Sequence, residues 1–274
     1  MTKLILNTAV FLILLICFQQ ARSQGTRLLR QPSASDTHIA FAHAGDIWIS
    51  ALDGSNVKRI SSTAAVEENP AISPDGKTIA FNSNKTGYQA VYTVAISGGQ
   101  AQQLTWHPSG AFVRGWSPDG NSVLYASSRE FAPRPSNRLW TIPKEGGVPV
   151  LLSSQRGFDG SFSPTGDAIA IDRVTRWESE FRNYRGGQNT PLILLNLDTQ
   201  SEVLIPNEKS IDLHPTWIGE TVYFLSDREG GVMNIWAYSV ADRDLDQLTQ
   251  YKGSDIKWLS GKDKLVFERE GYLH

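Results

Sequence analysis

The fold is decided by NPAISPDGKTIAFNS, residues 69–83, because this stretch returns along the chain with small changes. Two close copies are RGWSPDGNSVLYASS (114–128) and GSFSPTGDAIAIDR (160–173), and Ser73 lies 44 residues before Ser117. Looser copies are RQPSASDTHIAFAH (30–43), PTWIGETVYFLSDR (215–228) and KWLSGKDKLVFER (257–269). A repeat of this length is typical of propeller blades built from four strands.

Each copy carries the signals of four short strands. The first strand ends in a Ser-Pro-Asp-Gly turn, where proline fixes φ and glycine accepts the conformation that the turn requires. The second alternates apolar and polar residues, as in TIAF (78–81). A third, such as AVYTVAI (90–96), closes through Gly-Gly into a fourth, AQQLT (101–105). Helical periodicity is absent after residue 23, so the sequence predicts an all-β propeller.

The repeat gives five complete four-stranded blades and a truncated sixth with two strands. Their approximate ranges are 28–69, 70–115, 116–161, 162–215, 216–257 and the incomplete 258–274. A short last blade would leave the flank of the first uncovered, so we expect this chain to be an N-terminal piece of a longer protein. Only residues 24–27 precede the innermost strand of blade one, too few to add an outer strand to the last blade. We therefore predict a ring without interlocking strand closure, held by side-chain packing.

Residues 1–23 have the pattern of a signal peptide, and the propeller is expected over 24–274. Lys3 is followed by the apolar run 4–18 and by the small-x-small sequence Ala21-Arg22-Ser23. Fifteen mostly apolar residues are short for a bilayer, so export to the periplasm or beyond is predicted over an uncleaved anchor. The single cysteine, Cys17, would leave with this segment, and with it any disulfide, thiol nucleophile or Cys-ligated metal.

Neither the composition nor the motifs of the repeat indicate a catalytic, metal or cofactor site. Without residues 1–23 the net charge changes from −2 to −4, because Lys3 and Arg22 are lost, and nothing in it argues for nucleic acid or an anionic membrane as a partner. There is no G-x-S-x-G, no H-E-x-x-H and no calcium loop, so we expect no catalytic residue, metal or cofactor. Asp159-Gly160-Ser161 is interpreted as a turn at a blade boundary. His107 and His214, each followed by proline, are interpreted as equivalent structural positions between blades.

Tryptophan recurs at matching places in the copies. Such periodic aromatics predict packing between blades, with a ligand-stacking surface as the alternative. The residues are Trp48, Trp140 and Trp236 on third strands and Trp116, Trp217 and Trp258 on first strands.

WESEFRNYRGGQN (177–189) is an insertion in blade four that no other copy has. Its candidate binding residues are Arg176, Arg182, Tyr184 and Arg185. Arginine can hold a peptide carboxylate in a bidentate fork. Two alternatives stand beside this. In one, Trp177, Phe181 and Tyr184 pack the loop onto the blade while its arginines and glutamates pair with each other; in the other, the loop docks against another domain.

Three segments together resemble one family. RLLRQPSASDTHIAFAHAGDIWI (27–49), SFSPTGDAIAIDR (161–173) with RNYRGG (182–187), and PTWIGETVYFLSDREGGVMNIWAYSV (215–240) are similar to the six-bladed N-terminal propeller of tricorn proteases. The likeness runs in order over residues 28–274. Ser-Pro-Asp-Gly turns alone are shared with TolB-type repeats, whereas RNYRGG followed one blade later by PTWIG is more selective.

The resemblance implies a serine peptidase that degrades short peptides. It further implies a second propeller, a PDZ-like domain and a catalytic region after this one, association with neighbouring subunits, and propellers that filter and conduct peptides without strand locks. Archetypal members are cytoplasmic, which differs from the export predicted here. Two alternatives remain: a TolB-like periplasmic scaffold without enzyme activity, and a propeller fused to another hydrolase such as a metal-dependent amidohydrolase.

Overall fold

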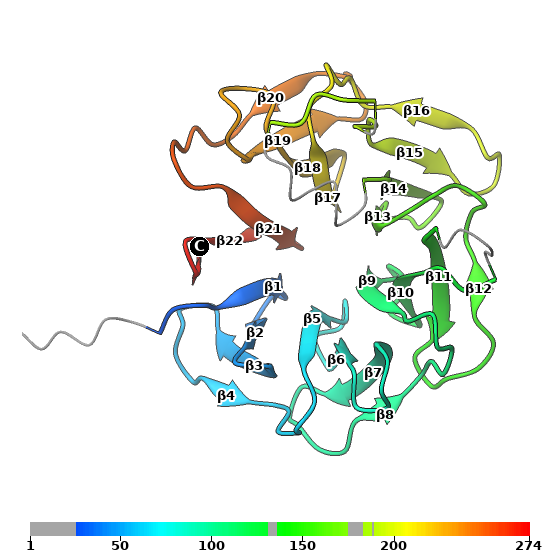
Figure 1. Ribbon diagram of the computed structural model, residues 1–274, viewed down its shortest axis with the longest axis vertical. Helices are drawn as coiled ribbons and strands as arrows, with labels where there is room; N and C mark the ends of the chain where they lie inside the picture. The colour runs from blue at the N-terminus through cyan, green and yellow to red at the C-terminus, as the bar shows by residue number, and fades with distance from the viewer. Residues whose placement is uncertain (1–25, 131–135, 175–182, 188) are drawn as a thin grey trace, which may run out of the picture.

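The computed structural model describes residues 26–130, 136–174, 183–187 and 189–274. These residues form six antiparallel sheets arranged as blades around a central axis (Figure 1). Within each blade the strands follow chain order from the axis outward, so that β1, β5, β9, β13, β17 and β21 are innermost. The predicted all-β propeller is therefore confirmed.

Five of these sheets have four strands and the sixth has three. Blades one to three contain β1 (Arg30–Ala34), β2 (His38–His43), β3 (Asp46–Ala51), β4 (Lys58–Arg59), β5 (Glu67–Ile72), β6 (Thr78–Ser83), β7 (Ala90–Ala95), β8 (Gln102–Gln103), β9 (Phe112–Trp116), β10 (Ser122–Ser127), β11 (Arg138–Pro143) and β12 (Val150–Leu151). Blades four to six contain β13 (Asp159–Phe162), β14 (Ala168–Asp172), β15 (Ile193–Asn196), β16 (Glu202–Leu204), β17 (Asp212–Ile218), β18 (Thr221–Ser226), β19 (Asn234–Ser239), β20 (Leu245–Gln247), β21 (Ile256–Gly261), β22 (Leu265–Arg269) and β23 (Tyr272–Leu273).

The innermost strands begin earlier than the sequence suggested. Every expected boundary between blades falls inside one of them, and at β5 and β17 the strand continues through Pro70 and Pro215. Both sit at β-bulges, where a strand tolerates proline because a ladder hydrogen bond is already missing. The last blade also gains a third short strand, β23, where two strands were expected.

Two smaller expectations were wrong. Asp159-Gly160-Ser161 is the start of β13 and pairs with β14 in regular register, so it is not a turn. His107 lies in the connection before β9, whereas His214 lies inside β17, so the two histidines are not equivalent.

The repeated turns satisfy their own polar groups. In the turn after β5, the Ser73 hydroxyl donates to Asp75 Oδ1 at 2.6 Å, and the same oxygen accepts the Lys77 N–H at 3.1 Å. The Ser73 hydroxyl is the largest of the effects that lower the pKa of Asp75. Ser117 and Asp119 repeat the arrangement after β9. Local closure of this kind explains why the turn could be recognised from four residues.

The core is divided among five apolar clusters, each shared by two neighbouring blades. Ile47 of blade one and Phe81 of blade two belong to the first, and Leu139 of blade three and Ile169 of blade four belong to another. Burial of such side chains contributes about 1.5–3 kcal/mol each. The predicted packing role of tryptophan is confirmed at the buried positions Trp116, Trp140 and Trp236.

The ring closes between blades six and one without an interlocking strand. In the part of the chain that the structure describes, no strand of blade one joins the sixth sheet, although β1 lies beside β21 (Figure 1). Side chains connect the two blades instead: Glu268 Oε2 accepts the Gln31 N–H at 3.0 Å, and Lys262 Nζ lies 2.7 Å from Asp36 Oδ2. One backbone hydrogen bond, from Leu29 to the carbonyl of Gly271, accompanies them. The predicted ring without an interlocking strand is therefore confirmed.

Blade four buries two carboxyl groups opposite each other. Asp159 on β13 pairs in register with Asp172 on β14, and both are buried. Burial raises the pKa of Asp172 well above its ordinary value of 3.8, and the charge of Asp159 raises it further. The Val174 N–H donates to Asp172 Oδ1 at 2.7 Å. Asp172 is therefore expected to keep its proton in the folded chain at pH values where an unfolded chain would lose it.

Gly160 is required by the close approach of blade three. A Cβ at this position would lie 2.7 Å from Leu139 Cδ1 and 2.9 Å from the Ala170 carbonyl oxygen. We expect Gly160→Ala to lower the free energy of unfolding by about 1–3 kcal/mol, because overpacking forces the strands apart. Urea denaturation measures this. Gly187→Ala, where no atom lies within 4 Å of the new Cβ, is the control and should change stability by less than about 0.5 kcal/mol. Equal effects would contradict the packing argument.

The Asp172 carboxyl predicts a pH dependence. Its pKa is higher in the folded chain than in the unfolded one, so the folded chain binds more protons above pH 3.8, and stability falls as pH rises toward the folded pKa. Asp172→Asn removes this titration and keeps an acceptor for Val174. We expect a flatter curve of unfolding free energy against pH, with the slope reduced by up to about 1.4 kcal/mol per pH unit, and a more stable protein at pH 7–8. Identical slopes would show that Asp172 does not hold its proton.

Candidate functional site: the axial channel

Bulges aim polar side chains from the innermost strands toward the axis. Five of the six innermost strands carry a bulge, where extra residues face a single residue of the partner strand. The bulge positions include Gln31, Asn69, Arg114, His214 and Lys257, and all five line one cavity. Bulges re-aim side chains and are common beside functional sites. In blade four β13 is regular, and Asp159 stands at the corresponding place.

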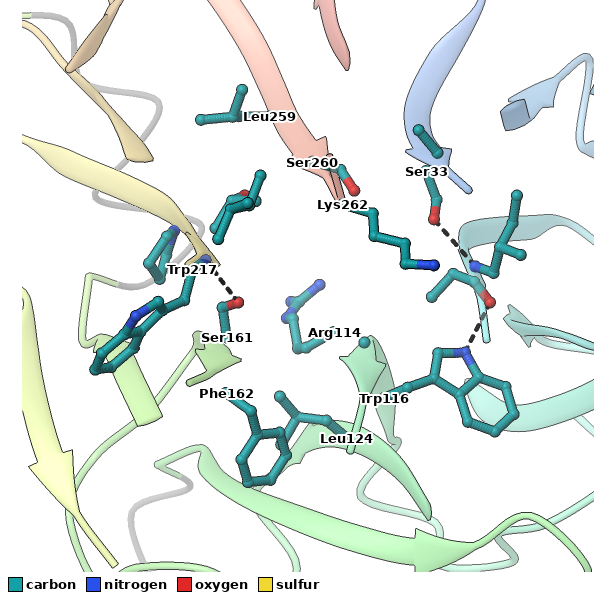
Figure 2. A pocket seen from close by; sticks show the side chains of 18 of the residues that line it. Ser33, Arg114, Trp116, Leu124, Ser161, Phe162, Trp217, Leu259, Ser260 and Lys262 are labelled. Carbon is teal, nitrogen blue, oxygen red and sulfur yellow. Dashed lines mark hydrogen bonds between the residues drawn. The ribbon is translucent and has the colours of Figure 1, made fainter. Parts of the chain in front are cut away.

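Two cavities meet on the axis. One, of about 390 Å³, is bounded by the ends of the innermost strands and the turns that follow them (Figure 2). The other, of about 270 Å³, is bounded by the beginnings of the same strands. Asn69, Arg114, His214 and Trp258 line both cavities, so these residues mark the level at which the cavities join. We call Gln31, Asn69, Arg114, Asp159, His214 and Lys257 the waist ring.

Arg114 is the central cation of the waist ring. Its Nε donates to the Phe158 carbonyl at 2.7 Å and its Nη1 to the Val113 carbonyl at 3.2 Å. The guanidinium lies over the Phe158 ring, 4.9 Å from the centroid, and its Nε is 3.8 Å from Asp159 Oδ1. Only 5% of the side chain is exposed. Figure 2 shows the guanidinium in the middle of the larger cavity.

His214 connects blades four, five and six. Its Nδ1 lies 2.7 Å from Asp159 Oδ2, across the boundary between β17 and β13. On the other side its ring packs against Trp258 of blade six, with 4.4 Å between centroids. Trp258 therefore faces the channel, in contrast to the buried tryptophans of the blade cores.

Amides continue the contacts through blades one, two and three. Gln31 Oε1 accepts the Asn69 N–H at 2.9 Å, and Asn69 Nδ2 donates to Asn82 Oδ1 at 3.0 Å. The same Asn82 oxygen accepts the Val113 N–H at 2.8 Å. The polar contacts described here cross five boundaries between blades, including the one closed by Glu268, and the ring contact of His214 with Trp258 crosses the boundary between blades five and six.

Further from the waist, hydrogen bonds between blades hold the wall of the larger cavity. The Ser33 hydroxyl accepts the Ile72 N–H at 3.0 Å, and the Ser161 hydroxyl accepts the Trp217 N–H at 2.9 Å. The Trp116 indole donates to the Ala71 carbonyl at 2.9 Å (Figure 2). These bonds fix neighbouring innermost strands relative to each other.

The structure places only part of the predicted binding loop. Arg176 and Arg182 lie outside the described residues. Tyr184 is half-buried against the apolar cluster of blades five and six. Arg185 Nη1 lies 2.7 Å from Asp227 Oδ2, and its Nη2 donates to the Asp227 carbonyl at 3.0 Å. Tyr184 packs against apolar side chains, whereas Arg185 pairs with Asp227 of blade five and not with a glutamate of the loop. A ligand role for the loop stays a prediction.

Sequence reasoning missed the waist ring, although a signal for it was present. In three copies a polar residue precedes proline at the same distance before the turn: Gln31-Pro32, Asn69-Pro70 and His214-Pro215. The residues before these prolines have positive φ of 52–53°, which bulges accommodate. A polar-proline pair repeated in the innermost strand is thus a marker of a side chain aimed at the axis.

Within the described ranges, no group of three or more His, Cys, Asp or Glu side chains is arranged to hold a metal ion. The same ranges contain no helix with the length and apolarity that a bilayer crossing requires.

Comparison with known proteins gives consistent results. The family model of the tricorn protease N-terminal beta propeller domain matches residues 26–274. Tricorn protease homolog 1 of Streptomyces coelicolor is 29% identical over 216 residues, which cover 74% of this chain and 19% of that protein. The tricorn protease homolog of Saccharolobus solfataricus is 26% identical over 246 residues, covering 86% of this chain and 22% of the relative. This chain thus spans about a fifth of the length of these relatives.

Solved structures share the fold. The crystal structure of the tricorn protease superposes with a TM-score of 0.79 at 20% identity, covering 90% of this chain and 25% of the other. A putative TolB from Agrobacterium tumefaciens gives a TM-score of 0.67 at 19% identity, covering 89% of this chain and 83% of the other. Because the family model spans all of the described propeller, the chain belongs to the tricorn protease N-terminal β-propeller domain family.

Proposed function

We propose that this chain is the non-catalytic N-terminal propeller of an exported, tricorn-like serine peptidase that degrades peptides. In that protein the propeller is a scaffold and a passage for substrate or product. The observation that carries the proposal is the pair of cavities that meet on the axis. Channels of propellers are usual ligand sites, and this one combines polar groups with apolar walls, as a peptide requires.

Two further observations support the proposal. The curated relatives are about five times as long as this chain, which leaves room for a second propeller, a PDZ-like domain and a catalytic region. The sequence of residues 1–23 supports export. Docking against downstream domains and neighbouring subunits is part of the same proposal, with the 177–189 insertion as one candidate contact.

Blocking the channel tests the passage. Ser260 lines the larger cavity on β21 (Figure 2), and Ser97 lies exposed in the turn between β7 and β8. We would introduce Ser260→Cys or Ser97→Cys into the processed full-length gene product and attach a bulky maleimide. We expect kcat/KM for peptides to fall about tenfold or more at position 260, equal to about 1.4 kcal/mol, and to stay unchanged at position 97. A small thiol reagent at position 260 is the second control, because it leaves the channel open.

The same preparations test the peptidase assignment. We expect this chain alone to hydrolyse no peptide, whereas the full-length gene product hydrolyses peptides and reacts with a serine-directed acylating reagent. A gene product without peptidase activity would favour the TolB-like scaffold. Activity that a chelator abolishes and the acylating reagent spares would favour the metal-dependent hydrolase. Equal rates at positions 260 and 97 after blocking would contradict the passage.

Export predicts a processed N-terminus. We expect the protein recovered from the periplasm or medium to begin at Gln24, because Ala21 and Ser23 are the small residues before the proposed cleavage point. N-terminal sequencing of the fractions measures this. Ala21→Arg should block processing and leave residues 1–23 attached. A protein that starts at Met1 in the soluble cytoplasmic fraction would rule out export, and one that starts at Met1 in the membrane would indicate an anchor.

A further inference from the structure

We propose that the waist ring binds a carboxylate group of a peptide in the channel, with Arg114 as the principal contact. This inference deepens the proposed passage and rests on it. It starts from the bulges: side chains from five separate blades reach one cavity because each strand departs from regular pairing at the same level. Gln31, Asn69 and His214 take positive φ there. Non-glycine residues in that conformation cluster at ligand sites.

The carboxylates near the waist are already occupied. Asp159 faces His214 through Oδ2 and Arg114 through Oδ1. Glu268 accepts the Gln31 N–H through Oε2, and its Oε1 lies 3.8 Å from Arg30 Nε. The other acids that line the smaller cavity also have partners: Glu68 Oε1 accepts from Gln89 Nε2, Asp227 pairs with Arg185, and Asp255 Oδ1 accepts the Met233 N–H. Each acid therefore has a donor or a cation of the protein beside it. A cationic ligand would have to displace these contacts, which also join neighbouring blades.

Two donors of the waist ring remain available to a ligand. Among the described residues, Arg114 Nη2 and Gln31 Nε2 have no hydrogen-bond acceptor, whereas the other nitrogens and oxygens of these two side chains are engaged. Lys257 Nζ has a single ion pair, with Asp255 at 3.9 Å, and its side chain is 61% exposed. Two cations and an amide N–H₂ around one cavity fit an acceptor that carries negative charge.

Arg114 is held ready for such a ligand. Two of its nitrogens are fixed by backbone carbonyls of β9 and the segment before β13, and its plane is supported by Phe158. A side chain fixed before binding loses little conformational entropy when the ligand arrives. The guanidinium is almost fully desolvated and its ion pair with Asp159 is long, so a carboxylate at Nη2 gains a charge-assisted hydrogen bond in a poorly hydrated place.

Aromatic side chains beside the waist suit the residue that bears the carboxylate. Phe112, Phe158 and Trp258 line the same cavity as Arg114. Their flat apolar surfaces can accept the side chain of a C-terminal residue while the carboxylate lies at Arg114. The cavity of about 270 Å³ has room for a residue of this kind. The geometry therefore points to an apolar or aromatic residue with a free carboxylate.

Binding by the purified chain tests this site. The probes are Ala-Ala-Phe with a free C-terminus and the same peptide as its C-terminal amide, titrated by calorimetry. We expect the free acid to bind at least about tenfold more tightly than the amide, because a charge-assisted hydrogen bond is lost in the amide. Arg114→Gln should lower the affinity for the free acid by about the same factor and leave the affinity for the amide unchanged. The variant should therefore bind the two peptides equally well.

Further variants and probes separate the alternatives. Lys257→Gln should lower the affinity for the free acid about two- to threefold, as expected for an exposed charge. Lys252 is an exposed lysine outside both cavities, so Lys252→Gln is the matched control and should leave the affinity unchanged. If circular dichroism shows that Arg114→Gln does not fold, Lys257→Gln still tests the carboxylate site, because the exposed Lys257 side chain can be replaced without disturbing the fold. Ala-Glu-Phe amide against Ala-Gln-Phe amide shows whether an acidic side chain can replace the terminal carboxylate.

Each outcome has a defined consequence. Equal affinity of the wild type for acid and amide overturns the carboxylate site while the passage stands. No binding of either peptide counts against the passage as well. Equal weakening of acid and amide by Arg114→Gln shows that Arg114 only supports the fold. Loss of the preference for acid in Arg114→Gln alone, with Lys252→Gln unchanged, establishes the site.

Discussion

The ring depends on the packing of each blade against the next. No single four-stranded sheet covers both of its own faces, and the five apolar clusters are each built from two neighbouring blades. Hydrophobic burial of this kind has no direction of its own. The orientation of one blade relative to the next is fixed by directional hydrogen bonds of the innermost strands, which involve Ser33, Ser161 and Trp116. The axial cavities are a consequence of this arrangement, because the innermost strands stop short of the axis.

Closure and channel lining share residues in this propeller. No strand of one blade locks into the sheet of another in the described chain, so the boundary between blades six and one relies on groups such as Gln31, Glu268 and Lys262. Gln31 also belongs to the waist ring, and Lys262 lines the larger cavity. Buried polar groups must be paired to be tolerated. A change at the waist therefore acts on stability and on the channel together, which is why the binding experiment compares two ligands within one variant.

The fold could be predicted because its signals are local in the sequence. Features that depend on contacts between distant segments could not be predicted. The Ser73–Asp75 turn closes within four residues, so its sequence was enough to place a hairpin. A bulge arises where two paired strands have unequal numbers of residues between the same hydrogen-bonded positions. The sequence of one strand alone does not show this. Gly160 looked like a turn residue, yet it is glycine because Leu139 of another blade approaches it. Of the predicted site residues, Arg185 proved to be engaged with the buried Asp227, and the waist ring was overlooked.

Blade four breaks the symmetry of the waist, and this gives the channel two unlike sides. Its innermost strand has no bulge and presents Asp159, which brings together Arg114 from blade three and His214 from blade five. Blades one and two contribute the amides of Gln31 and Asn69 to the opposite side. A molecule on the axis thus meets the cluster of Arg114, Asp159 and His214 on one side, and the amides of Gln31 and Asn69 on the other. The buried guanidinium of Arg114 lies on the first of these sides, so a carboxylate bound as proposed above would fix the orientation of the peptide along the channel.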